Sequence, residues 1–329
     1  MALFWLGFFA LIALLLVLDL GVLHRKAQVQ SLRSAAAWTA GWIALGLSFG
    51  GVVYLIYEHH WMGAHLRGCP PGHADGADAA ITYVSAYLLE QALSIDNIFV
   101  MSLLFTSFRM PAKYQHRVLF WGILGAIVFR ITMLGGGAYL AAQFEWVFYV
   151  FGAYLVWQGI KLLRGGDDDE QEKSTVVSFL RRFVRVVDGD HGGKFSVVVN
   201  GRRALTMVAM CLIVIELTDV VFALDSIPAV LSVSQETFIM VTSNIFAVMG
   251  LRSLYFVLAS LMAKFKYLKI ALAFLLVGIG AKMLAHHYYT MPHALSLILI
   301  AGIIAIGVLA SVIASRREAS GPGPASPSP

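Results

Sequence analysis

Seven oxygen-bearing side chains interrupt two otherwise apolar stretches of this chain, residues 79–106 and 204–231. They are Glu90, Asp96, Asn97, Glu216, Asp219, Asp225 and Ser226. Five of the seven are carboxylic acids, and an Asp at the centre of a membrane helix costs about 2.5–3.5 kcal/mol to insert. Acids in this setting must be paired, protonated or bound to a cation, which makes them the first candidates for a functional site.

The ligand chemistry of these side chains is uniform. Carboxylate, amide and hydroxyl oxygens are hard ligands that suit magnesium, calcium or manganese better than copper or zinc. Neither stretch contains His, and Cys211 stands at a position that the first stretch does not match. The pattern therefore predicts a site for a hard divalent cation. The alternative is internal ion pairing, because Arg130, Arg252 and Lys282 also lie in apolar runs and could neutralise three of the five acids.

Helical spacing places some of the seven residues together. At about 100° per residue, Glu90 shares a face with Asn97, and Asp219 shares one with Ser226. Glu216 stands three residues before Asp219 and lies on the same face as that acid. Each stretch therefore predicts one polar face within an apolar helix.

Asp96 and Asp225 stand about 120° away from those faces on an unbroken helix. Either each Asp faces a second partner, or the helix is broken beside it. Pro228 favours unwinding next to Asp225, because proline lacks an N–H and its ring disrupts the preceding turn. Unwound backbone in mid-membrane would free carbonyl oxygens for a cation.

The elements that carry these residues are predicted to be membrane helices. The 329 residues are 59% hydrophobic and 13% charged, whereas a soluble domain has about 25% charged residues. About nine apolar runs reach the ~20 residues that a span needs, so we predict an all-α, polytopic membrane helical bundle. The runs are 2–23, 35–57, 79–106, 117–141, 144–163, 204–231, 237–260, 267–285 and 292–314.

The remaining segments are polar. The first run has no basic region before it and no small-residue cleavage site after it, so we expect a retained span. Residues 164–203 form a long loop in which Asn200-Gly201 predicts a tight β-hairpin. Residues 315–329 are rich in Gly, Pro and Ser and are expected to be disordered. The two cysteines, Cys69 and Cys211, offer neither a disulfide framework nor a zinc site.

The charge distribution predicts the orientation. Most of the 24 Lys and Arg residues fall in alternate loops, which the positive-inside rule assigns to the cytoplasm. Arg67 is the one basic residue of the opposite loops. The N-terminus is therefore expected outside, the C-terminus in the cytoplasm, and membrane lipid around the bundle. Because the basic residues stand at the ends of apolar runs and form no patch, no nucleic-acid partner is expected.

The two acid-bearing stretches belong to a predicted internal repeat. In 90–98 and in 219–227, an acid is followed six residues later by Asp, a small polar residue and Ile. Arg130 and Arg252 occupy matching places in the runs that follow, and Gly-x-Lys recurs at 159–161 and 280–282. The loop count gives the two copies opposite directions, an arrangement typical of secondary transporters. The alternative is chance similarity among apolar helices.

The chain is thereby divided into six predicted segments. They are a two-helix extension at 1–57, a first three-helix repeat at 79–163, a cytoplasmic loop at 164–203, a second three-helix repeat at 204–285, a last helix at 292–314 and the tail at 315–329.

Two weaker polar features lie outside the repeats. Asp19, near the inner end of the first run, either joins the site or lies at the interface. Seven histidines fall in outward loops, where solvated loops are expected rather than a metal-collecting vestibule. They are His59, His60, His65, His73, His286, His287 and His293.

Four motifs carry a resemblance to a known family. They are 90–97, 216–228, Ser243-Asn-Ile-Phe-Ala247 and Gly250-Leu-Arg-Ser-Leu-Tyr-Phe256. With them the chain closely resembles the TerC family of bacterial integral membrane proteins, in its Alx-like branch, from about residue 18 to 283. One departure is visible, because 204–207 is Ala-Leu-Thr-Met where the family usually has Thr-Pro. It affects the start of a helix rather than the site.

The resemblance implies an inner-membrane protein of the LysE-like transporter group, with manganese(II) export as the activity and tellurium resistance as the historical label. It also implies that the seven polar residues named first are the family's acidic and polar site positions. Our first hypothesis is therefore an exporter without a tightly bound cofactor, which exchanges manganese for protons. The alternative is a membrane scaffold whose acids are structural. An enzyme is not expected, because HExxH and an intramembrane nucleophile with a base are absent. The oligomeric state stays open.

Overall fold

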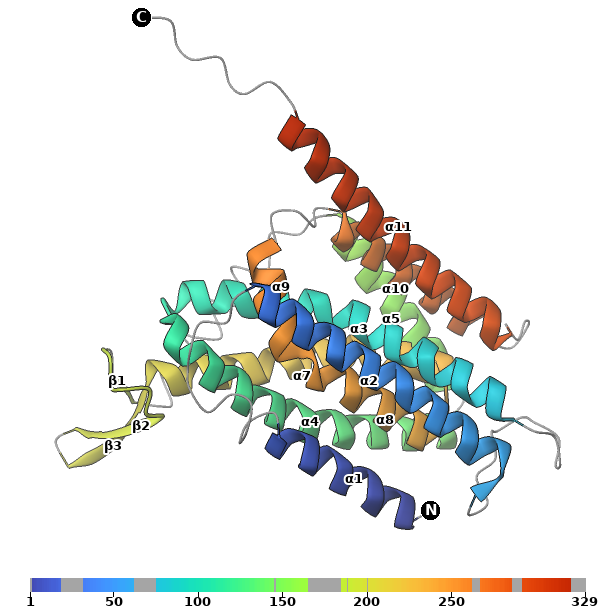
Figure 1. Cartoon of the computed structure of the whole chain (residues 1–329), viewed down its shortest axis with the longest axis horizontal. Helices are drawn as coiled ribbons and strands as arrows, with labels where there is room; N and C mark the ends of the chain where they lie inside the picture. The colour runs from blue at the N-terminus through green and yellow to red at the C-terminus, as the bar shows by residue number, and fades with distance from the viewer. Residues whose placement is uncertain are drawn as a thin grey trace, which may run out of the picture.

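The computed structural model describes residues 2–18, 32–61, 75–144, 146–164, 185–187, 189–199, 201–261, 267–285 and 292–320. The helices are α1 (Ala2–Val17), α2 (Leu32–Glu58), α3 (Gly76–Ser107), α4 (Ala112–Gln143), α5 (Trp146–Leu163), α7 (Met207–Val233), α8 (Thr237–Met249), α9 (Leu251–Leu261), α10 (Leu268–Leu284) and α11 (His293–Ser320). The strands are β1 (Val186–Val187), β2 (Ser196–Val199) and β3 (Arg202–Thr206). Figure 1 shows the helices as a bundle, with α1 and α11 on its outside and the small sheet at one end.

Many of the helices are suited to a bilayer. Six of them, α2, α3, α4, α5, α7 and α11, are long and apolar enough to cross a membrane, and α8 with α9 would make a seventh crossing. The two remaining apolar helices, α1 and α10, are shorter. The all-α, multi-span prediction is therefore confirmed, while nine crossings stay a prediction.

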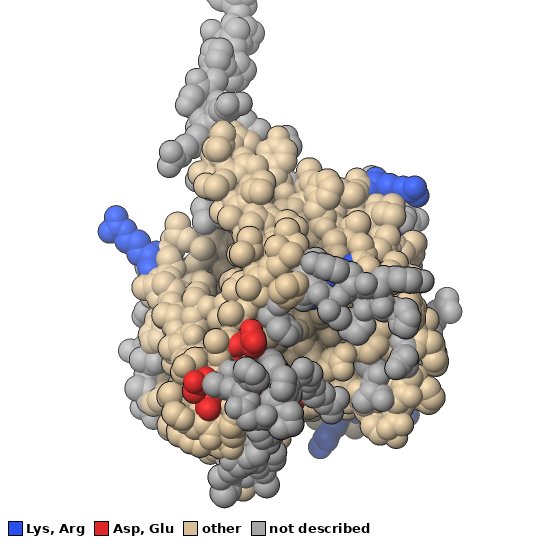
Figure 2. Space-filling model, turned by 90° about the vertical axis from the view of Figure 1, so that its right-hand side faces the viewer, with Lys and Arg blue, Asp and Glu red and all other residues tan. Residues whose placement is uncertain are grey.

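The outer surface of the bundle agrees with a lipid environment. Figure 2 views the bundle from the right-hand side of Figure 1, and few of the described residues visible there are charged. Large apolar side chains such as Ile298 and Ile306 on α11, Trp157 on α5 and Phe274 on α10 are exposed. A soluble protein rarely leaves so much apolar area uncovered, so these side chains are suited to face lipid chains.

Close helix contacts fix the register of the bundle. The Tyr83 hydroxyl on α3 donates to the Gly46 carbonyl oxygen on α2 at 2.9 Å. About two turns further along α3, the Gln91 amide donates to the Ala247 carbonyl oxygen on α8 at 3.4 Å. Gly122 and Gly137 of α4 lie against Ile215 and Ile227 of α7. Because both numbers rise together, α4 and α7 run parallel.

The predicted unwinding beside Asp225 is wrong. Helix α7 runs without a break through Pro228, and α3 is likewise continuous past residues 96 and 97. Ile227 packs on Gly137 of α4, and residues 226–231 are all buried. Tertiary packing on this turn therefore holds the helix although one N–H is missing. The break in the described spans falls instead at Gly250, where α8 and α9 meet at 46°.

The predicted hairpin is confirmed in position. Val199 of β2 pairs with Arg202 of β3 in an antiparallel register, which leaves a two-residue loop. Gly201 has φ +73, the left-handed conformation that glycine adopts at little cost. Asn200 lies outside the described residues, as do most of the predicted loop and the tail after Ser320. Strand β3 leads directly into α7, and the Thr206 hydroxyl caps that helix by accepting from the Ala209 N–H at 3.3 Å.

Candidate functional site

A buried ionic cluster joins three helices of the bundle. Arg130 of α4 is 1% exposed, and its Nε and Nη2 atoms donate to the two carboxylate oxygens of Asp219 on α7 at 3.2 and 3.1 Å. Its Nη1 atom forms an ion pair with Glu90 of α3. The planar guanidinium suits this geometry, because it donates along two parallel bonds to one carboxylate and keeps a third direction free. One cation therefore holds Glu90 and Asp219, the two acids that occupy matching places in the predicted repeats.

The cluster lies near the middle of its helices. Glu90, Arg130 and Asp219 each stand more than ten residues from both ends of α3, α4 and α7. At 1.5 Å per residue, each is roughly 20 Å from either end. If these helices cross a bilayer, the cluster lies deep in its hydrocarbon region, where unpaired charge is most costly.

The described charges of the cluster do not balance. Two carboxylates, Glu90 and Asp219, face one guanidinium, and a third acid is close by. Glu216 is half-buried one turn before Asp219 on α7, and its carboxylate lies where a side chain on Gly125 of α4 would be. An excess of buried negative charge is unfavourable unless protons or a further cation neutralise it.

Within the part of the chain that the structure describes, several buried polar atoms on α3, α7 and α8 make no hydrogen bond. Among them are Oε2 of Glu90, Oγ of Ser94, Oε2 of Glu216, Oγ of Ser226 and both amide atoms of Asn244. Buried polar groups are nearly always hydrogen-bonded in folded proteins. Most of these atoms are hard oxygen donors, the type that a divalent cation prefers.

Asp225 belongs to a second polar group. The Gln158 amide on α5 donates to Oδ1 of Asp225 at 2.9 Å and to the Tyr154 hydroxyl oxygen at 2.8 Å. Tyr154 also hydrogen-bonds to Asp225. Of the two alternatives that the helical spacing left open, Asp225 therefore follows the second-partner one. Gln158 is a polar residue within the apolar run 144–163, and that signal could have identified it from the sequence.

The predicted site residues are only partly brought together. Asn97 is 3% and Ser226 3% exposed, while the side chain of Asp96 and all of Asp19 lie outside the described part of the structure. Among the described residues, no three His, Cys, Asp or Glu side chains converge as a metal ion requires. The assignment of all seven residues to one metal shell therefore stays a prediction.

The intramembrane bases behave differently from one another. The pairing predicted for Arg130 is present, but Lys282 donates to the Ser296 hydroxyl at 2.7 Å rather than to an acid. Arg252 is 2% exposed. Of the outward histidines, His59, His60 and His293 fall within the described residues, and His60 lies 3.8 Å from Asp75.

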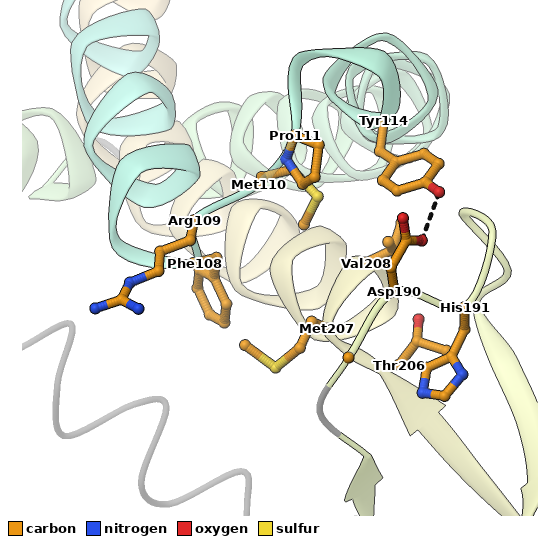
Figure 3. A pocket seen from close by; sticks show the side chains of 11 residues that line it. Phe108, Arg109, Met110, Pro111, Tyr114, Asp190, His191, Thr206, Met207 and Val208 are labelled. Carbon is orange, nitrogen blue, oxygen red and sulfur yellow. Dashed lines mark hydrogen bonds between the residues drawn. The ribbon is translucent and has the colours of Figure 1, made fainter.

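A cavity of about 220 Å³ lies outside the ionic cluster, between the small sheet and the start of α4. Figure 3 shows Asp190 at its edge with the Tyr114 hydroxyl directed at it; the hydroxyl donates to the carboxylate at 2.5 Å. Lys113 donates to the same carboxylate at 3.0 Å, and the Gly192 N–H at 2.9 Å. These donors hold the pKa of Asp190 at about 2, below its ordinary value of 3.8. This acid is already satisfied and serves to dock the sheet on α4.

The fold and the cluster together define a class, the polytopic helical membrane proteins with a buried ionic centre. The sequence model described as the integral membrane protein TerC family matches residues 75–319. The chain belongs to this family. Helices α1 and α2 precede the matched region.

The relatives cover nearly the whole chain. An uncharacterised membrane protein of Myxococcus xanthus is 41% identical over 314 residues, 95% of this chain and 93% of that protein. One of Rickettsia bellii is 37% identical over 310 residues, 94% and 97% of the two chains. A protein of Escherichia coli strain K12, named as a candidate membrane-bound redox modulator, Alx, is 38% identical over 320 residues, 96% of each. No solved structure matches this chain.

Proposed function

We propose that this protein exports a hard divalent cation, manganese(II) in the first instance, through the carboxylate centre of α3 and α7. The observation that carries the proposal is the cluster of Glu90 and Asp219 around Arg130. Among the described residues, this cluster has more acids than bases, and several buried oxygens near it have no hydrogen-bond partner. A structural ion pair needs only equal charges, whereas a cation site needs carboxylates in excess. The choice of manganese among hard cations rests on the family resemblance alone.

The architecture supports transport by two inverted repeats. In the predicted repeat, residues 152 and 159 of α5 correspond to 273 and 280 of α10. A side chain on Gly152 would meet the Gly280 carbonyl oxygen, and one on Gly159 would meet the Ala273 carbonyl oxygen. If each residue is replaced by its counterpart in the other repeat, the first contact becomes the second. A two-fold axis between α5 and α10 would require this relation. Arg130 contacts the first helix of both proposed repeats, so a shared centre could respond when they rock against each other.

Proton exchange is the coupling that this centre favours. A carboxylate that releases a divalent cation in a buried setting regains neutrality by binding a proton. Two protons for one divalent ion would keep the charge of the centre constant. We therefore propose antiport, with the loops 164–203 and the C-terminus in the cytoplasm of a bacterial inner membrane.

The test uses Asp96→Asn and Asp225→Asn. Each substitution keeps the size of the side chain and removes its charge, so manganese efflux from cells loaded with the ion should fall to the level of a deletion strain. Asp78→Asn is the matched control, because Asp78 is an exposed acid in the first turn of α3. Efflux that is unchanged in both variants would contradict the assignment of these acids to the pathway.

A membrane scaffold is the second candidate, and one observation favours it. Arg130 satisfies both oxygens of Asp219 and one of Glu90, as it would if the acids only held the helices together. Deleting residues 165–184 separates the two functions. An exporter should keep manganese efflux, whereas a docking platform should lose its phenotype with the loop.

A further inference from the structure

We propose that Arg130 is a two-position residue, which occupies the cation site of the ion-free protein and moves to Glu216 when a divalent cation binds. This inference rests on the proposed function. It concerns how the site is emptied and filled, and it makes Arg130 a positioning residue rather than a ligand.

The first step is competition for the same oxygens. Arg130 uses both oxygens of Asp219 and contacts Glu90. A divalent cation held by these two carboxylates would need the same lone pairs. Two cationic groups cannot share them in a buried site, because their repulsion is poorly screened there. Binding of the ion therefore requires the guanidinium to leave.

The second step is a place for the guanidinium to go. An arginine released inside a bundle must find another acceptor, since an unpaired buried charge costs several kcal/mol. Glu216 stands one turn before Asp219 on α7, about 5 Å along the helix. Its carboxylate lies against Gly125 of α4, the helix that carries Arg130, and its Oε2 makes no hydrogen bond to any residue that the structure describes.

The third step is that the Arg130 side chain can reach Glu216. A helical side chain leans toward the N-terminus of its helix, so Arg130 leans toward the level of Gly125 and Glu216. Helices α4 and α7 run parallel here, with Gly122 on Ile215 and Gly137 on Ile227. Rotation about the side-chain bonds of Arg130 can therefore exchange Asp219 for Glu216 without a helix shift. The missing side chain at Gly125 provides the room.

The consequence is a defined cycle. Without an ion, Arg130 joins α3, α4 and α7 and neutralises the centre in part. With an ion, it pairs with Glu216 and leaves Glu90 and Asp219 to the cargo. Its return displaces the ion, so Arg130 lowers the affinity for cargo and speeds its release.

The experiment measures manganese binding and transport on the purified full-length protein. Arg130→Gln should bind manganese(II) about tenfold more tightly by calorimetry, because a competitor with charge-assisted hydrogen bonds is gone. The same variant should carry manganese several-fold more slowly in vesicles, since release is impaired. A structural role would weaken binding and transport together. Lys282→Gln is the matched control, a half-buried base bonded to Ser296, and should leave the manganese affinity unchanged.

A second variant tests the alternative acceptor. Glu216→Gln should weaken manganese binding about tenfold, because the displaced guanidinium loses its partner. The double variant with Arg130→Gln should bind as tightly as Arg130→Gln alone. If the double variant binds more weakly than Arg130→Gln, Glu216 is itself a ligand and the two-position assignment is wrong. If Arg130→Gln does not fold, Arg130→Met replaces it in both comparisons, with tighter binding again expected because the competing charge is likewise removed.

The outcomes separate this inference from the proposed function. Wild-type protein that neither binds nor transports manganese would refute the exporter. Wild-type protein that transports manganese, with an Arg130 variant that binds no more tightly, would refute the switch and leave the exporter standing.

Discussion

The close contact between α5 and α10 predicts that Gly280→Ala destabilises the protein. A Cβ atom at residue 280 would lie 2.6 Å from the Gly152 carbonyl oxygen and 2.9 Å from the Val156 nitrogen. Ordinary van der Waals contact begins at 3.4 Å. The closest approach is thus about 0.8 Å too short, and both opposing atoms belong to the backbone. Helices α5 and α10 must therefore separate, because no side chain can rotate away.

The expected cost follows from overpacking in a dense interior. Inserting a methyl group into such a contact destabilises a protein by about 1–3 kcal/mol. Intrinsic helix propensity works in the opposite direction, since Ala is favoured over Gly by about 1 kcal/mol. We expect a net loss that lowers the unfolding temperature by about 2 °C or more. Thermal unfolding of the full-length protein in detergent, followed by tryptophan fluorescence, measures it.

Gly278→Ala supplies the control on the same helix. A Cβ atom there would have no neighbour within 4 Å, so this variant gains the helix propensity without the clash. It should be as stable as the wild type or more stable. Equal stability of Gly280→Ala and Gly278→Ala would show that the two backbones do not approach so closely, and would remove this contact from the argument for inverted repeats.

Three further predictions follow from single contacts. Asp219→Asn should lower the free energy of unfolding by about 3 kcal/mol or more, because it leaves the Arg130 charge without its bidentate partner; chemical denaturation measures the loss. Gly125→Ala should keep an unfolding temperature close to that of the wild type, unlike Gly280→Ala, because the Glu216 carboxylate that the new methyl group meets is the end of a flexible side chain and can turn away. The pKa of Asp190 is depressed to about 2, so its stabilising effect is complete above pH 4 and disappears as the pH falls toward 2. Asp190→Asn should thus be less stable than wild type at pH 5 and equally stable near pH 2.

Much of the secondary structure follows from simple sequence patterns. The apolar run 204–231 contains most of α7, which spans 207–233, because burial in lipid requires long uninterrupted apolar helices. The hairpin follows from Asn200-Gly201, whose backbone preference is local. Pro228 misled the prediction for α7, because its local effect is outweighed by packing against α4. The bend at Gly250 was not predicted, because no proline lies near that residue in the sequence.

The pairing of charges could be predicted only as a possibility. The sequence shows that Arg130 needs an acid, but the choice of Glu90 and Asp219 depends on the register between α3, α4 and α7. The register between α4 and α7 is set by contacts such as those of Gly122 and Gly137 of α4 with isoleucines of α7. The partner of Asp225 was missed for a related reason. Gln158 is uncharged, and its hydrogen bond to Asp225 can be recognised only when α5 is placed beside α7.

The most direct test of the account is manganese transport by the purified protein in sealed lipid vesicles with an imposed proton gradient. The account predicts that the wild type carries manganese(II) in exchange for protons, that Asp225→Asn carries less than about one-tenth as much, as expected when an essential charge is lost, and that Asp78→Asn equals the wild type. Vesicles that take up no more manganese than empty ones, or an Asp225→Asn variant as active as the wild type, would contradict it.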